Sequence, residues 1–169
     1  MKTLLENIYK YLFTLDLQQQ PLPVTPPKEK PLSNREKLLN IALEAYGTDP
    51  TPNDVQDDQF ACVESLTTLL HKLYPDIPIM TYTPVLLKYL QKDNRFKPTS
   101  EFKEGNIILS PTLSGNGKVV GHVGLIGKGG KVLSNSSSTG LFLDKYDCVS
   151  WVQRYSKLGQ LDLYLFELN

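Results

Sequence analysis

Cysteine and histidine are scarce in this sequence, with only two of each among 169 residues. Two cysteines, Cys62 and Cys148, are too few for a disulfide scaffold, and two free thiols are typical of a protein made in the cytosol. A single bridge between them stays compatible with the sequence. The scattered positions and the lack of an H-E-x-x-H motif argue against zinc, and we expect neither a metal nor a cofactor.

Net charge and long apolar runs are also absent. Lys plus Arg equals Asp plus Glu at 18 each, so there is no basic field to attract a polyanion, and we expect no nucleic-acid partner. No stretch reaches the roughly 18 consecutive apolar residues of a membrane span, so no transmembrane segment is predicted. Polar residues interrupt the opening MKTLLENIYKYLF, and no small-residue cleavage site follows, so we expect synthesis in the host cytoplasm without a signal peptide.

The length of 169 residues fits one compact domain with a modest appendage. With 40% hydrophobic and 21% charged residues, the composition is that of a globular protein. Apolar residues at steps of three and four predict an amphipathic helix over residues 1–17. Residues 18–32 hold five prolines and are typical of an extended linker. This N-terminal arm either docks on its own domain or attaches to a partner protein or virion, and the sequence leaves both open.

The main domain is predicted over residues 33–169 and begins with helices. Capping and stop signals predict one helix from the Ser33–Glu36 capping box to Gly47, a second from Phe60 to Pro75, and a third from an N-cap at Thr83 to about Gln91. Cys62 falls in the first turn of the second helix.

After Pro98 the spacing of apolar residues changes from helical to strand-like. Strands are predicted at 106–110, 122–127, 131–134 and 162–168, with a glycine hairpin turn at 128–131. Residues 145–155 predict a short helix before the last strand. Helices followed by an antiparallel sheet indicate an α+β fold.

Cys62 is the candidate nucleophile. A thiol reacts as the thiolate, which the unpaired amides at the start of a helix favour. A lone cysteine between Ala61 and Val63 is more often a small buried hydrophobe, so the interpretation depends on a base. His122 is the candidate base, because it begins an apolar strand between two glycines, where an imidazole has no obvious packing role. The other histidine, His71, lies nine residues further along the Cys62 helix and is expected at the surface.

A third group must hold the ring of such a base. The polar run that follows the hairpin offers Asn135 as the predicted orienting residue, with Ser134 as the competing candidate. The backbone amide of Cys62 is one expected oxyanion donor, and the second is not assigned. Asp58, just before the Cys62 helix, is a further candidate for substrate or oxyanion contact, although a carboxylate there also serves simply as a favourable charge at the helix start.

The order of FACVESL, EGNIILSP, GHVGLIG, a glycine hairpin and VLSN resembles the NlpC-type and CHAP branches of the papain-like superfamily, closest to small phage or prophage proteins. The resemblance covers about residues 34–168 and implies a papain-like α+β fold, with helices packed on an antiparallel sheet. It implies Cys62 as nucleophile, His122 as base and Asn135 as the orienting residue. The usual substrates of the family are amide bonds in peptidoglycan stem peptides or cross-bridges.

Two positions depart from the family pattern. Gly105 and Asn106 stand where the family commonly has Gly-Asp before the first strand, and the third catalytic position falls on Ser134 or Asn135 according to the hairpin length. The expected function is that of a cysteine peptidase or amidase acting on peptidoglycan, similar to a phage lysin. The alternatives are a non-catalytic virion or structural module on the same fold, and a thioester-forming acyltransferase. Without a signal peptide, delivery to the cell wall would need a holin, a virion or lysis from within.

Overall fold

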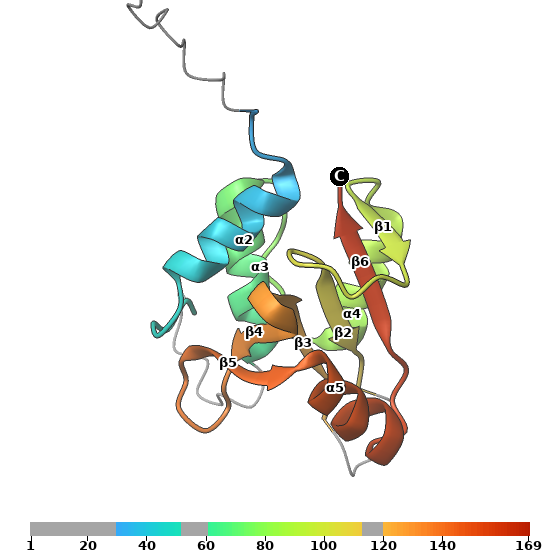
Figure 1. The fold of residues 1–169 in the computed structure, drawn as a ribbon. Coiled ribbons are helices and arrows are strands. Elements are labelled where there is room, and N and C mark those ends of the chain that lie inside the picture. Colours follow the sequence, from blue (N-terminus) through green and yellow to red (C-terminus); the bar gives the residue numbers. More distant parts are fainter. Residues whose placement is uncertain (1–29, 52–60, 113–119) are drawn as a thin grey trace, which may run out of the picture. The chain divides into compact units, whose positions relative to one another are not determined.

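The computed structural model describes residues 30–51, 61–112 and 120–169 (Figure 1). Apart from Lys30 and Pro31, all of these belong to one compact unit, Leu32–Asn169. The helix predicted over residues 1–17, most of the 18–32 linker and the candidate Asp58 lie outside the described residues. The described part is an α+β fold with helices before an antiparallel sheet, as predicted.

The three predicted helices are present as α2 (Asn34–Glu44), α3 (Ala61–Leu73) and α4 (Thr83–Lys92). The capping box of α2 is confirmed, since the backbone N–H of Glu36 donates to Ser33 Oγ and the backbone N–H of Ser33 donates to the Glu36 carboxylate. The prediction that Thr83 is the N-cap of α4 is wrong. Tyr82 holds that position, because the Thr83 hydroxyl instead accepts a hydrogen bond from the backbone N–H of Thr112.

One sheet holds all the strands of the described residues, in the order β1-β6-β2-β3-β4-β5, and every neighbouring pair is antiparallel. The strands are β1 (Phe96–Thr99), β2 (Ile107–Ser110), β3 (His122–Ile126), β4 (Lys131–Asn135), β5 (Phe142–Asp147) and β6 (Tyr164–Leu168). The four predicted strands are β2, β3, β4 and β6. The sequence analysis missed β1 and β5, which are the two edges of the sheet.

The helix predicted over residues 145–155 begins later than expected. Residues 145–147 belong to β5, and Asp147 caps the short helix α5 (Cys148–Trp151) by accepting from the backbone N–H of Ser150. A π-helical segment, η2 (Val152–Leu158), continues the chain. The predicted hairpin turn is confirmed as η1 (Lys128–Gly130), where Gly129 and Gly130 adopt the positive φ that favours glycine.

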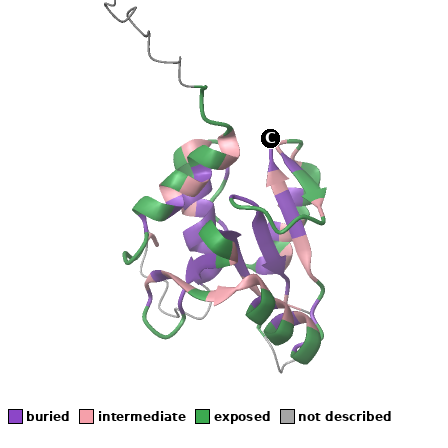
Figure 2. Ribbon diagram, viewed as in Figure 1, coloured by how far each residue is buried: buried purple, intermediate pink, exposed green. Residues whose placement is uncertain are grey.

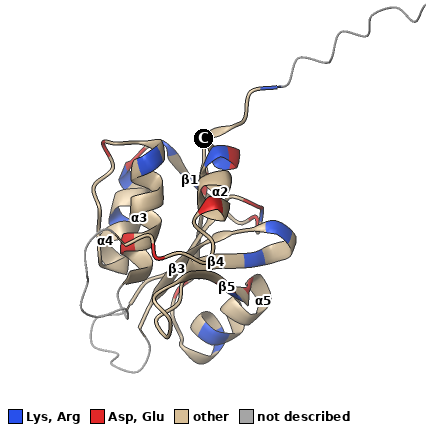
Figure 3. Ribbon diagram, turned by 90° about the vertical axis from the view of Figure 1, so that its left-hand side faces the viewer, with Lys and Arg blue, Asp and Glu red and all other residues tan. Residues whose placement is uncertain are grey.

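Helices cover both faces of the sheet, with α3 and α4 on one side and α5 on the other (Figure 3). On the first side, α2, α3 and α4 pack their apolar residues against strand residues such as Val123, Leu125 and Leu133. On the second side, Trp151 and Tyr155 pack against Ile108, Ile126 and Val132. The sheet is therefore buried between two layers, and its buried strands run through the middle of the unit (Figure 2).

Candidate active site

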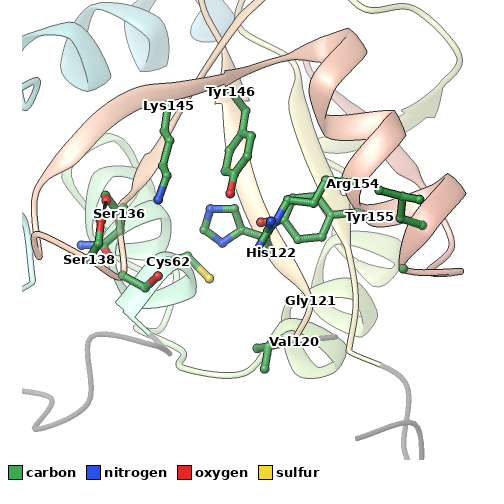
Figure 4. A pocket seen from close by; sticks show the side chains of 14 residues that line it. Cys62, Val120, Gly121, His122, Ser136, Ser138, Lys145, Tyr146, Arg154 and Tyr155 are labelled. Carbon is green, nitrogen blue, oxygen red and sulfur yellow. Dashed lines mark hydrogen bonds between the residues drawn. The ribbon is translucent and has the colours of Figure 1, made fainter. Parts of the chain in front are cut away.

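Cys62 and His122 line the same cavity, which has a volume of about 660 Å³ (Figure 4). Its walls come from the start of α3, the start of β3, the end of β4, the strand β5 and the segment η2. The other lining residues are Val120, Gly121, Asn135, Ser136, Ser137, Ser138, Lys145, Tyr146, Arg154, Tyr155, Leu158 and Gly159. The two residues chosen from the sequence as nucleophile and base are therefore brought to one site.

The thiol of Cys62 lies in the first turn of α3, as predicted, and only 5% of the residue is exposed. Burial raises the pKa of Cys62 to about 11, although hydrogen bonds from the backbone amides of Val123, Val63 and Cys62 favour the thiolate. The amides at the helix start thus favour the thiolate, as expected, but desolvation outweighs them and the unliganded thiol is neutral. Both Cys62 and Cys148 are free thiols, so the bridge left open by the sequence is not formed.

His122 is partly exposed at the first position of β3, and aromatic rings surround it. Trp151 and Tyr155 stack on the imidazole at centroid distances of 5.2 and 5.6 Å, and Tyr146 meets it edge-on at 6.2 Å. Burial lowers the pKa of His122 to about 4, and the nearby positive charges of Arg154 and Lys145 lower it further. The imidazole is therefore neutral at neutral pH, as a general base must be before it accepts a proton.

Ser134, and not Asn135, contacts the imidazole. Ser134 Oγ lies 3.1 Å from His122 Nε2. Asn135 also lines the cavity, but its Nδ2 donates to the carbonyl of Gly140 at 2.8 Å and not to the ring. The prediction that Asn135 orients the base is corrected accordingly, and the competing candidate takes that position.

The thiol and the ring face one another. The Cys62 sulfur lies beside the His122 imidazole in Figure 4, and the amide of Val123, the residue after His122, bonds to the same sulfur. Ser134 occupies Nε2, so Nδ1 is the ring nitrogen without a hydrogen-bond partner among the described residues.

Close backbone packing explains why a glycine precedes His122. A Cβ atom on Gly121 would collide with the backbone of Ser110, Pro111 and Thr112. Glycine therefore lets the start of β3 lie against the end of β2 and brings the imidazole to the cavity. His71, by contrast, is exposed at the surface as predicted, with Nδ1 2.8 Å from the carbonyl oxygen of Ile77.

Trp151, Arg154 and Tyr155 lie around His122 and are not among the candidate residues of the sequence analysis. The Trp151 indole is fully buried and donates to Ser110 Oγ at 3.2 Å. Arg154 lies over the rings of Tyr146 and Tyr155 at 5.8 and 5.6 Å. Their spacing along one helical segment was the available signal. However, the sequence analysis predicted a helix over 145–155, and so it did not recognise the strand β5 that carries Tyr146.

Within the described residues, no group of three or more His, Cys, Asp or Glu side chains could hold a metal ion. No helix in that part of the chain is long and apolar enough to span a bilayer. A comparison with protein-family models found none that matches the chain, and a comparison with curated proteins found no match either.

Proposed function

We propose that this protein is a papain-like cysteine hydrolase that cleaves amide bonds, with peptidoglycan as its substrate. The proposal is carried by one observation, which is that the Cys62 thiol and the His122 imidazole share a cavity while Ser134 fixes the ring. Ring orientation by a third polar group is what a nucleophile and base pair requires. The choice of peptidoglycan rests on the resemblance to the NlpC and CHAP proteins.

In the proposed reaction, Cys62 Sγ attacks the carbonyl carbon of the amide while His122 Nδ1 takes the thiol proton. The imidazolium then returns this proton to the leaving amine, and a thioester remains on Cys62. Water, deprotonated by the neutral imidazole, releases the acid and restores the thiol. Because the resting thiol and imidazole are both neutral, the proton moves during the attack and no ion pair waits in the unliganded site.

The test compares wild-type protein with Cys62→Ala on purified cell walls, with mass spectrometry of the released fragments. Cys148→Ala is the matched control, because it also removes one free thiol, on the other side of the sheet. We expect wild type and Cys148→Ala to release peptides with new amine ends, and Cys62→Ala to release none. Wall degradation by Cys62→Ala at the wild-type rate would overturn the proposal.

A non-catalytic module on the same scaffold is the second candidate, and the burial of Cys62 favours it. A thiol that is 5% exposed with a pKa of about 11 is what a purely structural cysteine would show. Alkylation of Cys62 against pH, with His122→Ala alongside, separates the two functions. A catalytic pair gives an alkylation rate that falls when the imidazole is removed, whereas a structural cysteine gives the same slow rate in both proteins.

A further inference from the structure

Two cations stand on the wall of the catalytic cavity. Lys145 comes from β5 and Arg154 from η2, and both side chains line the space in front of Cys62 and His122 (Figure 4). Their charges reach the catalytic ring, because both lower the pKa of His122. Among the described residues that line the cavity there is no Asp or Glu.

Neither cation has a carboxylate partner within the described part of the chain. The ion pairs found there involve Arg35 and Arg95 on other parts of the surface. Asp144, the residue next to Lys145, instead accepts a hydrogen bond from the Tyr46 hydroxyl at 2.8 Å. Two exposed positive charges thus face a cavity whose described walls do not neutralise them.

Local distortions of the backbone accompany both cations. Between Val132 and Ser134 of β4, the partner strand β5 has one extra residue, which is a β-bulge. The bulge lets consecutive residues Lys145 and Tyr146 both line the cavity. Arg154 and Tyr155 similarly come from the π-helical segment η2, a rare geometry that is frequent at functional sites. Such irregularities disrupt the regular hydrogen bonds of a sheet or helix, and they are frequent where the direction of a side chain is changed at a functional site.

We infer that Lys145 and Arg154 bind a carboxylate of the substrate, so that the hydrolase takes an acidic peptide and not a neutral one. This inference deepens the proposed function and rests on it for the cleaved bond. Arg154 offers paired N–H donors to a carboxylate, and Lys145 adds a second charge. A bound carboxylate also offsets both charges and thereby makes the His122 imidazole a stronger base, so an acidic substrate would assist its own cleavage.

The test uses two alkylating reagents of nearly the same shape, iodoacetate and iodoacetamide, which differ by one negative charge. The rate ratio of iodoacetate to iodoacetamide is measured at Cys62 by mass spectrometry. Cys148 serves as an internal reference, because the neighbouring Asp147 gives it a negative surrounding. We expect the ratio at Cys62 to exceed that at Cys148 by about fivefold or more at low salt, and to fall when salt screens the charges.

Lys145→Gln and Arg154→Gln should each lower the Cys62 ratio toward the Cys148 value. Lys88→Gln is the matched control, since it removes an exposed cation of α4 that does not line the cavity. The salt dependence of the rate ratio at Cys62 of the wild-type protein tests the inference without any variant. An unchanged ratio in both cavity variants, or a wild-type ratio equal to that of Cys148, would overturn it.

The two proposals fail in different ways. A raised iodoacetate-to-iodoacetamide ratio at Cys62, in a protein that releases nothing from cell walls, would support carboxylate binding by Lys145 and Arg154 and reject the proposed hydrolase. Cleavage of cell walls by a protein whose iodoacetate-to-iodoacetamide ratio at Cys62 equals that at Cys148 would support the proposed hydrolase and reject carboxylate binding by Lys145 and Arg154. A Cys62 that reacts with neither reagent in the folded protein would overturn both, because a substrate would then have no access to the thiol.

Discussion

At the scale of single residues, the contact between Ser134 Oγ and His122 Nε2 leaves Nδ1 as the ring nitrogen available to the thiol in the proposed reaction. We predict that Ser134→Ala lowers the rate of the proposed amide cleavage roughly tenfold or more, because the ring loses its orientation. Ser134→Thr retains the hydroxyl and should restore much of the rate. The measurement is the rate of fragment release from cell walls, together with the pH dependence of Cys62 alkylation.

A matched control for this variant is Ser110→Ala, which also removes a buried strand hydroxyl that bonds to an aromatic neighbour, here Trp151. Ser110→Ala should lower stability but leave the pH dependence of Cys62 alkylation unchanged. Equal pH profiles for Ser134→Ala and wild type would show that the serine has only a packing role.

The depressed pKa of His122 makes the fold sensitive to acid. The ring has a pKa of about 4 when folded and about 6.5 when unfolded, so between these values the unfolded chain binds the extra proton. The contribution of the neutral His122 to the free energy of unfolding is therefore complete above pH 6.5, and it is lost as the pH falls toward 4. Allowing for partial exposure of the ring, we predict that about 2 kcal/mol of unfolding free energy disappears across this range.

Urea unfolding of wild type and His122→Gln at several pH values checks this prediction. The difference between the two proteins isolates the histidine, since carboxylates such as Asp93, whose pKa is lowered to about 2 beside Arg95, are common to both. A difference that does not change between pH 7 and 4 would contradict the prediction.

At the scale of elements, the β3–β4 pair carries both His122 and Ser134, and Gly124 lies in β3 close to β4. A Cβ on Gly124 would lie 2.6 Å from Val132 Cγ1 and 2.8 Å from the carbonyl oxygen of Leu133. We predict that Gly124→Ala destabilises the protein by roughly 2 kcal/mol, because the two strands must separate. The glycine that follows His122 in the sequence, Gly124, is thus explained by close strand packing.

Gly127→Ala is the control for this variant, because its added Cβ would come no closer than 3.3 Å to the Leu133 side chain and 3.5 Å to the carbonyl oxygen of Lys131. Its cost should be well below that of Gly124→Ala in urea or thermal unfolding. Equal losses in both variants would mean that the strands tolerate the collision at Gly124 by some other adjustment.

The same scale shows where sequence patterns worked and where they did not. The capping box at Ser33 and the apolar spacing of α3 are local signals, and both predicted their helices correctly. Edge strand β1 contains Pro98, and an edge tolerates proline because one side of it needs no partner. β5 alternates irregularly through its bulge, so its last residues resembled the start of a helix.

At the scale of the whole molecule, the described core lies entirely within the unit Leu32–Asn169. Among the described residues, the first fully buried apolar residue is Leu38. We therefore predict that removing residues 1–31 leaves the melting temperature and the Cys62 alkylation rate unchanged. Differential scanning calorimetry and mass spectrometry of the shortened chain check this, and a loss of several degrees would show that the arm docks on its own domain.

The sequence by itself determined the α+β class, the three main helices, four of the strands and the pairing of Cys62 with His122 as candidates. These depend on caps, on periodic apolar residues and on the chemistry of two scarce side chains, all of which are written along the chain. Only the tertiary structure decided that Ser134 meets the ring, that burial keeps the thiol and imidazole neutral, and that Lys145 and Arg154 face the cavity. The reason is physical, because strand register, bulges and desolvation arise only when distant segments pack together.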